Sequence, residues 1–210
     1  LGIIPPGQFL PAAERYGIVP DIDRWVVHQT LAWLATLGEQ ARHLRVNINI
    51  CGTAASDTQF HEFVRDRINE FGVPPRSLCF EITESDAIRS LANAAALIEG
   101  LGDLGCRFAL DDFGAGFTSF RYLRDFYFDI LKIDGEFIRQ LANDKTSRVM
   151  VEAIHGVAQA LGLRTVAEFV GDADTLEILR SIGVDMAQGY YLGKPVPLDD
   201  VLPVLASGRG

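Results

Sequence analysis

The stretch Phe108–Ser119, with the sequence FALDDFGAGFTS, joins a short apolar run to two adjacent carboxylates and then to a loop of glycine and hydroxyl residues. Neighbouring side chains of a strand point to opposite faces, so Asp111 and Asp112 can share a target only where the strand is ending and turning. Two carboxylates held that close repel each other unless a cation lies between them or one takes up a proton. Gly114 and Gly116 permit a tight loop over a ligand. The alternative is a solvated Asp-Asp turn without a ligand.

Strand-like and helix-like segments alternate along the rest of the chain. Apolar runs predict strands at residues 44–50, 78–84, 107–110, 128–134, 164–168 and 184–188. Helices are expected at about residues 11–18, 23–37, 58–71, 86–102, 118–125, 145–161 and 172–182, with a helical turn at 135–141 and a turn or entry segment at 1–10. This alternation predicts an α/β fold with a parallel sheet covered by helices. A closed barrel needs about eight strands, and the missing ones are expected upstream of Leu1.

Each predicted strand ends in polar or charged side chains. These are Asn47 and Asn49, Glu81 and Glu84, Asp111 and Asp112, Lys132 and Asp134, Glu168, and Gln188. The carboxyl ends of parallel strands lie at one edge of the sheet, where such folds place their chemistry. We therefore expect these segments to converge on one site. The alternative for any single residue is a polar side chain that only reaches solvent.

The residue types at these strand ends favour a hard divalent cation. Carboxylate and amide oxygens suit Mg²⁺ or Mn²⁺ better than Zn²⁺, and the four histidines form no zinc-binding pattern. Asp111 and Asp112 are expected to bridge two such ions, with Glu81 and Asn47 completing the ligand shell. Two metal ions a few ångströms apart are a common arrangement for in-line attack on a phosphodiester.

Lys132 and Glu168 each have a catalytic and a structural interpretation. Lys132 either holds or deprotonates the attacking water and balances charge, or it forms a structural ion pair with Asp111 or Asp134. Glu168 either binds a metal or orients water, or it forms a salt bridge at the end of its strand.

Gln188 and Glu84 are expected to act outside the metal shell. The amide of Gln188 offers a donor and an acceptor, which suits the edge of a nucleotide base, although pinning a loop is the alternative. Glu84 is expected to hold the glycine loop through Thr118 or Ser119 rather than to bind metal.

Composition limits the partners and the cellular location. The 210 residues carry 19 basic and 28 acidic side chains, a formal net charge of −9, which argues against binding a nucleic-acid polymer or an anionic membrane. The three scattered cysteines indicate reduced thiols in the cytoplasm, and no apolar run has the length of a membrane span, although a parent protein can be membrane-anchored elsewhere. The abrupt start at Leu1 suggests a fragment of a longer protein.

Six ordered motifs resemble those of the EAL domain family. They are VNIN, FEITES, DDFGAGFTSF, YFDILKIDG, TVAEFV and DMAQGYYLGKP, and together they cover nearly the whole chain. Members of this family are bacterial phosphodiesterases that open cyclic di-GMP to linear pGpG. The resemblance implies a single EAL-like domain over residues 1–210, folded as a TIM-like barrel with one strand reversed and incomplete at the amino end.

The resemblance also implies a role for each matching position. It places Asn47, Glu81, Asp111 and Asp112 at metal-binding positions, Lys132 and Glu168 at water-activating positions and Gln188 at a guanine-contacting position. It makes residues 112–119 a loop that couples metal binding to homodimer formation, with Glu84 as its anchor. It further implies an upstream GGDEF or sensory domain.

Two departures from the family pattern bear on activity. The Glu-Ala-Leu tripeptide, whose Glu is a metal ligand, is absent from this chain, so these 210 residues are expected to bind metal poorly and turn over slowly or not at all. Gly171 stands where a second Glu is usual, with Asp172 beside it as a displaced substitute. Three hypotheses for the function follow: an active phosphodiesterase in the parent protein, a degenerate receptor for cyclic di-GMP, or a dimerisation module without a ligand.

Overall fold

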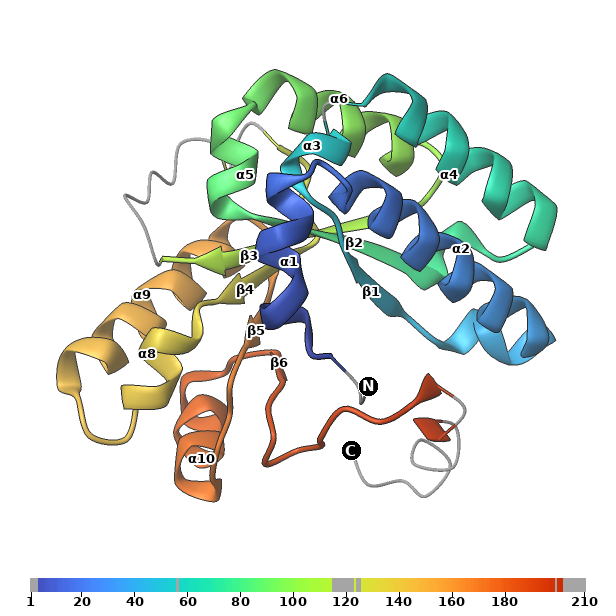
Figure 1. Ribbon diagram of the computed structural model, residues 1–210. Coiled ribbons are helices and arrows are strands. Elements are labelled where there is room, and N and C mark those ends of the chain that lie inside the picture. Colours follow the sequence, from blue (N-terminus) through green and yellow to red (C-terminus); the bar gives the residue numbers. More distant parts are fainter. Residues whose placement is uncertain (1–3, 56, 115–122, 124–125, 199, 202–210) are drawn as a thin grey trace. The chain divides into compact units, whose positions relative to one another are not determined.

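The computed structural model describes residues 4–55, 57–114, 123, 126–198 and 200–201 (Figure 1). Thr118 and Ser119, and nearly all of the helix expected at 118–125, lie outside the described residues. Contacts divide the chain into two compact units, Leu1–Phe108 and Ala109–Gly210. No helix in the described part of the chain combines the length and apolar character that a membrane span requires.

The first unit holds two parallel strands and most of the helices that pack around them. Its elements are α1 (Pro6–Arg15), α2 (Val19–Thr36), the 3₁₀ helix η1 (Gly38–His43), β1 (Val46–Asn49), α3 (Gly52–Ala55), α4 (Thr58–Phe71), the 3₁₀ helix η2 (Pro75–Ser77), β2 (Leu78–Thr83), α5 (Glu84–Arg89) and α6 (Leu91–Gly102). β1 pairs with β2 in parallel from Val46 opposite Leu78 to Asn49 opposite Glu81. α2 packs on α4, and α4 packs on α6 (Figure 1).

The second unit continues the alternation of strands and helices. β3 (Arg107–Phe113) starts at the end of the first unit and is followed by β4 (Ile130–Ile133), α8 (Gly135–Gln140), α9 (Lys145–Ala160), β5 (Arg164–Ala167), α10 (Ala173–Ile182) and β6 (Met186–Ala187). β3 to β6 are parallel neighbours in sequence order. All four residues of β4 are buried, as expected of a strand covered on both faces.

Two sequence expectations about helices were wrong. Residues 1–10 were expected to be a turn, but α1 begins at Pro6, because a proline in the first helical turn loses no hydrogen bond and already has a helical φ. The single helix expected at 86–102 is two helices, α5 and α6, separated at Ser90. Thr83 starts α5 early by accepting a hydrogen bond from the amide of Asp86 at 3.2 Å.

Asp23 is a buried carboxyl on α2. Its side chain accepts a hydrogen bond from the backbone amide of Cys51 at 2.9 Å, and the residue is 6% exposed. Burial raises the pKa of Asp23 above its usual 3.8 and outweighs the hydrogen bond from Cys51, which lowers it; the nearby Asp86 raises it further. The folded chain therefore holds this proton more tightly than the unfolded chain.

We predict that Asp23→Asn stabilises the chain at pH 7 by about 1 kcal/mol, because the amide oxygen keeps the bond to Cys51 without a buried charge. Folding takes up a proton between pH 3.8 and the raised pKa, so the wild type gains stability as the pH falls through this window. The advantage of the variant should shrink over the same range in urea unfolding. Asp21→Asn, at an exposed position of α2, is the control. A variant less stable than the wild type at pH 7 would contradict the assignment.

Candidate active site

The two adjacent aspartates lie at a bulge inside β3. Leu110 pairs with Leu131 and Phe113 pairs with Ile133, so three steps on β3 face two steps on β4. The extra residue breaks the strict alternation of the strand, and Asp112 takes a positive φ of 54°. The expectation that the strand stops before the pair was wrong, because β3 runs on to Phe113. The bulge lies where the two carboxylates come close together, and that they share a metal ion stays a prediction.

Lys132 joins carboxylates from the strands on both sides of β4. Its Nζ lies 2.9 Å from Oδ1 of Asp111 on β3 and 2.8 Å from Oε1 of Glu168, which directly follows β5. The side chains of Lys132, Asp111 and Glu168 are 3, 12 and 10% exposed. This geometry fits both the structural and the catalytic interpretation of Lys132, because the ion pair with Asp111 also places the ammonium among the acidic groups. The alternative pairing with Asp134 is not made, since that carboxylate accepts from the amide of Glu136 and caps α8.

The cluster has the donor set that a divalent cation requires. Asp111, Asp112 and Glu168 each place one carboxylate oxygen within 4.8 Å of the others. Three carboxylates and one ammonium leave a formal charge of −3 + 1 = −2 when all are ionised. Hard oxygen donors with an excess negative charge fit Mg²⁺ or Mn²⁺. Removing one partner of such a buried network leaves an unpaired charge and costs about 3–5 kcal/mol.

The first unit contributes a second polar pair. Nδ2 of Asn47 on β1 donates to Oε1 of Glu81 on β2 at 2.6 Å, so the predicted metal contact of Asn47 would use its amide oxygen. Glu81 is 3% exposed and Glu84 is 4% exposed. The expected contacts of Glu84 with Thr118 and Ser119 fall outside the described residues, so this role stays a prediction. That Asn47 and Glu81 join the cluster of the second unit also stays a prediction.

Gln188 is tied to the segment that carries Glu168. Its backbone amide donates to the backbone carbonyl of Ala167 at 2.8 Å, and its backbone carbonyl accepts from the backbone amide of Val170 at 3.0 Å. A Cβ at Gly189 would overlap the backbone of Val170, so only glycine permits this close approach. The side chain of Gln188 is exposed at the end of β6. The side-chain amide that is predicted to contact a base is therefore exposed. The backbone of Gln188 is hydrogen-bonded to Ala167 and Val170, close to Glu168 in the chain.

Asp172 serves as the N-cap of α10. Its Oδ1 accepts from the amide of Thr175 at 2.7 Å. This bond lowers the pKa of Asp172, and the carboxylate is exposed. Gly171 is also exposed. The carboxylate that the sequence suggested as a displaced substitute for a second Glu thus has a helix-capping task.

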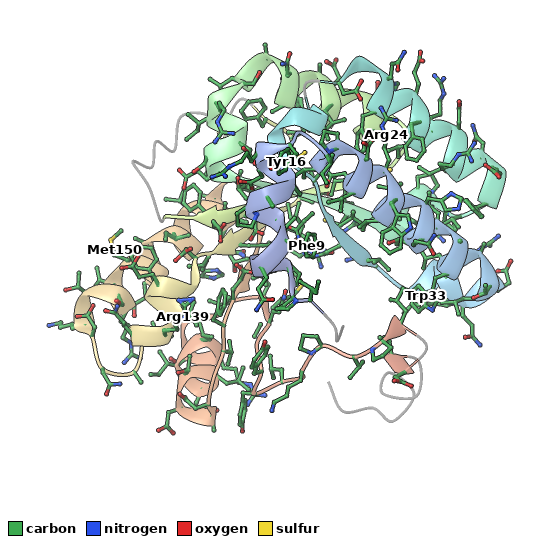
Figure 2. The ribbon with its side chains drawn as sticks, in the orientation of Figure 1. Phe9, Tyr16, Arg24, Trp33, Arg139 and Met150 are labelled. Carbon is green, nitrogen blue, oxygen red and sulfur yellow. The ribbon has the colours of Figure 1, made fainter. Side chains whose placement is uncertain are left out.

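A packing arrangement beside Glu168 was not predicted from the sequence. Phe169 has a positive φ of 55°, which is rare for an aromatic residue, and its side chain is over Gly135, where a Cβ would overlap the ring. The guanidinium of Arg139 lies 4.1 Å from the centre of the same ring. Arg139 is labelled in Figure 2. Gly135 and Arg139 both belong to α8, so Phe169 fixes the chain after β5 against that helix. Gly135, two residues after the end of β4, was the sequence signal of such a close approach.

These features define an α/β domain with an acidic, lysine-bridged site at the carboxyl ends of its strands. The family model of the EAL domain matches residues 1–195, and the chain belongs to the EAL domain family. The family predicted from the sequence motifs is therefore confirmed.

Curated relatives are much longer than this chain. Cyclic di-GMP phosphodiesterase PdeB of Shewanella oneidensis is 37% identical over 93% of this chain and 23% of PdeB. The bifunctional diguanylate cyclase/cyclic di-GMP phosphodiesterase MucR of Pseudomonas aeruginosa is 34% identical over 98% of this chain and 30% of MucR. The chain spans about a quarter of the length of the first curated relatives it matches.

Solved structures share the fold. The PaMucR phosphodiesterase in complex with c-di-GMP is 32% identical, with a TM-score of 0.89 over 95% of this chain and 81% of that one. The Xanthomonas citri FimX EAL domain in complex with c-di-GMP is 30% identical, with a TM-score of 0.88 over 94% of this chain and 78% of that one. The predicted α/β fold of the EAL type, a TIM-like barrel, is confirmed.

We predict that Gly135→Ala destabilises the chain by about 1–3 kcal/mol, because the new methyl group overlaps the ring of Phe169. Adding Phe169→Gly should remove much of this penalty, since it deletes the ring and relieves the positive φ. Urea unfolding of both single variants and the double variant measures the coupling. Gly156→Ala is the matched control, because its Cβ meets nothing within 4 Å on α9 and should be neutral or stabilising. Additive single effects would contradict this packing.

Proposed function

We propose that this domain gives its parent protein the ability to hydrolyse cyclic di-GMP to linear pGpG with two Mg²⁺ or Mn²⁺ ions. The observation that carries the proposal is the bridge from Lys132 to Asp111 and Glu168 beside Asp112. The names of the relatives support the substrate, because PdeB and MucR are cyclic di-GMP phosphodiesterases and solved EAL domains hold c-di-GMP.

In this proposal the residues divide into ligands and water-handling groups. Asp111 and Asp112 hold the cations through their carboxylates, with Glu81 and Asn47 of the first unit completing the ligand shell. The bound ions would polarise the phosphodiester and lower the pKa of the attacking water. Glu168 accepts a hydrogen bond from that water and orients it. Gln188 donates to and accepts from a guanine edge.

Lys132 has two tasks in this scheme. Its ammonium keeps Asp111 and Glu168 together in a fixed geometry before substrate arrives. It also stabilises the hydroxide form of the attacking water, because a nearby positive charge favours the deprotonated species. Its burial, at 2% exposure, strengthens both effects by excluding water.

A second candidate function is a receptor that binds cyclic di-GMP without hydrolysing it. Gly171 carries no side-chain donor, and the neighbouring Asp172 already caps α10. A site that lacks one carboxylate can still bind the nucleotide through its other contacts. It would lose hydrolysis if that reaction needs the missing negative charge. Glu84 as the anchor of the loop, a homodimer, an upstream GGDEF or sensory domain and a cytoplasmic location remain predictions. The cyclase half of the MucR name supports the upstream domain.

We predict that the full-length parent protein converts cyclic di-GMP to pGpG in the presence of Mg²⁺ or Mn²⁺, and that Lys132→Met lowers kcat about 10²–10⁴-fold. The loss follows because the water loses its stabilising ammonium and the carboxylates lose their partner. Chromatography of the nucleotide products measures turnover, and thermal unfolding verifies that the variant is folded.

Lys145→Met is the matched control, because Lys145 is an exposed lysine at the start of α9 and should leave turnover unchanged. Tight binding of cyclic di-GMP without pGpG in the wild-type parent would favour the receptor. Absence of both binding and product would overturn both functions. Equal turnover by folded Lys132→Met and wild type would remove Lys132 from the mechanism.

A further inference from the structure

A basic pocket lies in the first unit at the amino ends of the strands. It has a volume of about 470 Å³ and is lined by Arg42, His43, Leu44, Arg45, Arg76 and Arg107. None of the described residues that line it carries a carboxylate. Four arginine residues line this one pocket, in contrast with the chain as a whole, which has a net charge of −9.

The pocket is built where three strands begin. Arg45 precedes β1, Arg76 lies in η2 directly before β2, and Arg107 is the first residue of β3. Glu81 lies three positions beyond Leu78, the first residue of β2, which is about 10 Å along the strand at the usual rise. Within the first unit the pocket therefore lies at the amino end of β2, whereas Glu81 lies toward its carboxyl end, and the pocket does not depend on the proposed hydrolysis.

Two contacts hold the arginine-bearing turns together. The hydroxyl of Ser77, which is fully buried, donates to the carbonyl of Ala41 at 2.7 Å and joins η2 to η1. Gly105 has a φ of +96°, and a Cβ there would lie 3.7 Å from Cβ of Pro75, which brings the turn before Arg107 against η2. The pocket thus exists before any ligand arrives, which reduces the entropic cost of binding.

The cations of the pocket are accessible to a ligand. Arg42 pairs with Glu39 at 3.2 Å, but the two side chains are 54 and 81% exposed. An exposed ion pair of this kind contributes at most about 1 kcal/mol and exchanges readily with another anion. Arg76 is exposed and Arg107 is half-buried. Positive charges around one pocket repel one another, and a bound anion would reduce that repulsion.

We propose that this pocket binds a small anion that carries two or more linked phosphate groups. The guanidinium group matches phosphate with paired, charge-assisted hydrogen bonds, and four of them spread over three chain segments fit a longer anion better than a single phosphate. Each phosphate group carries about one to two negative charges near pH 7, so two or three groups balance four arginines. The volume lies in the range of small-ligand sites, about 300–1,000 Å³. Leu44 is the one apolar side chain of the lining, so the phosphate chain rather than a base is recognised.

Calorimetric titration of the full chain with inorganic tripolyphosphate tests the proposal. The buffer contains low salt and no divalent cation, so the acidic cluster around Asp111 repels the probe. We expect saturable binding that weakens about tenfold or more in Arg76→Gln/Arg107→Gln, because two charge-assisted contacts are lost. ATP should bind like tripolyphosphate and adenosine should not bind. Comparing tripolyphosphate, ATP and adenosine shows whether the pocket recognises the phosphate chain or the nucleoside.

Arg180→Gln is the matched control, because Arg180 is an exposed arginine on α10, far along the chain from the pocket, and should leave the affinity within about twofold of wild type. Circular dichroism verifies that each variant is folded. No heat of binding at millimolar tripolyphosphate, or equal affinity in the folded double variant, would overturn the proposal. Tighter binding of an oligoglutamate peptide than of tripolyphosphate would overturn it in favour of an acidic protein partner. Each outcome is independent of turnover of cyclic di-GMP.

Discussion

The bridge that Lys132 forms between Asp111 and Glu168 is the interaction on which the second unit depends. It links three consecutive parallel strands through side chains rather than through the backbone ladder. A buried ammonium between two buried carboxylates is tolerated only because all three groups are satisfied together. The ion pairs need β3, β4 and β5 in the register that the backbone pairing gives them, so the side-chain and backbone contacts support the same arrangement.

Much of the fold and the candidate site could be predicted from the sequence, because the information was local. Apolar runs of four to seven residues followed by charged side chains located the strands and gathered Asp111, Lys132 and Glu168 correctly. Parallel pairing then follows from the intervening helices, since strands joined by helices return in the same direction. The ordered motifs added the family, which the family model confirms.

The remainder depends on contacts between distant residues. The bulge in β3 cannot be inferred from its own sequence, because the extra residue is defined by the pairing with β4. The split between α5 and α6 lies at Ser90, whose φ of −145° is not helical, and the helical pattern over 86–102 conceals it. A positive φ at Phe169 is contrary to the preference of an aromatic residue and is stabilised by Gly135 and Arg139 from another element.

The fit between Phe169 and Gly135 has a consequence for how this sequence can diverge. Neither position can be substituted alone without affecting the other, because the ring fills the volume that any larger side chain at Gly135 would need. The two sites therefore form an epistatic pair: a residue tolerated at one position in this background would be rejected in a background with a different partner. A larger residue at Gly135 becomes acceptable only after the ring of Phe169 has been replaced by a smaller side chain, so the order of the two changes is constrained.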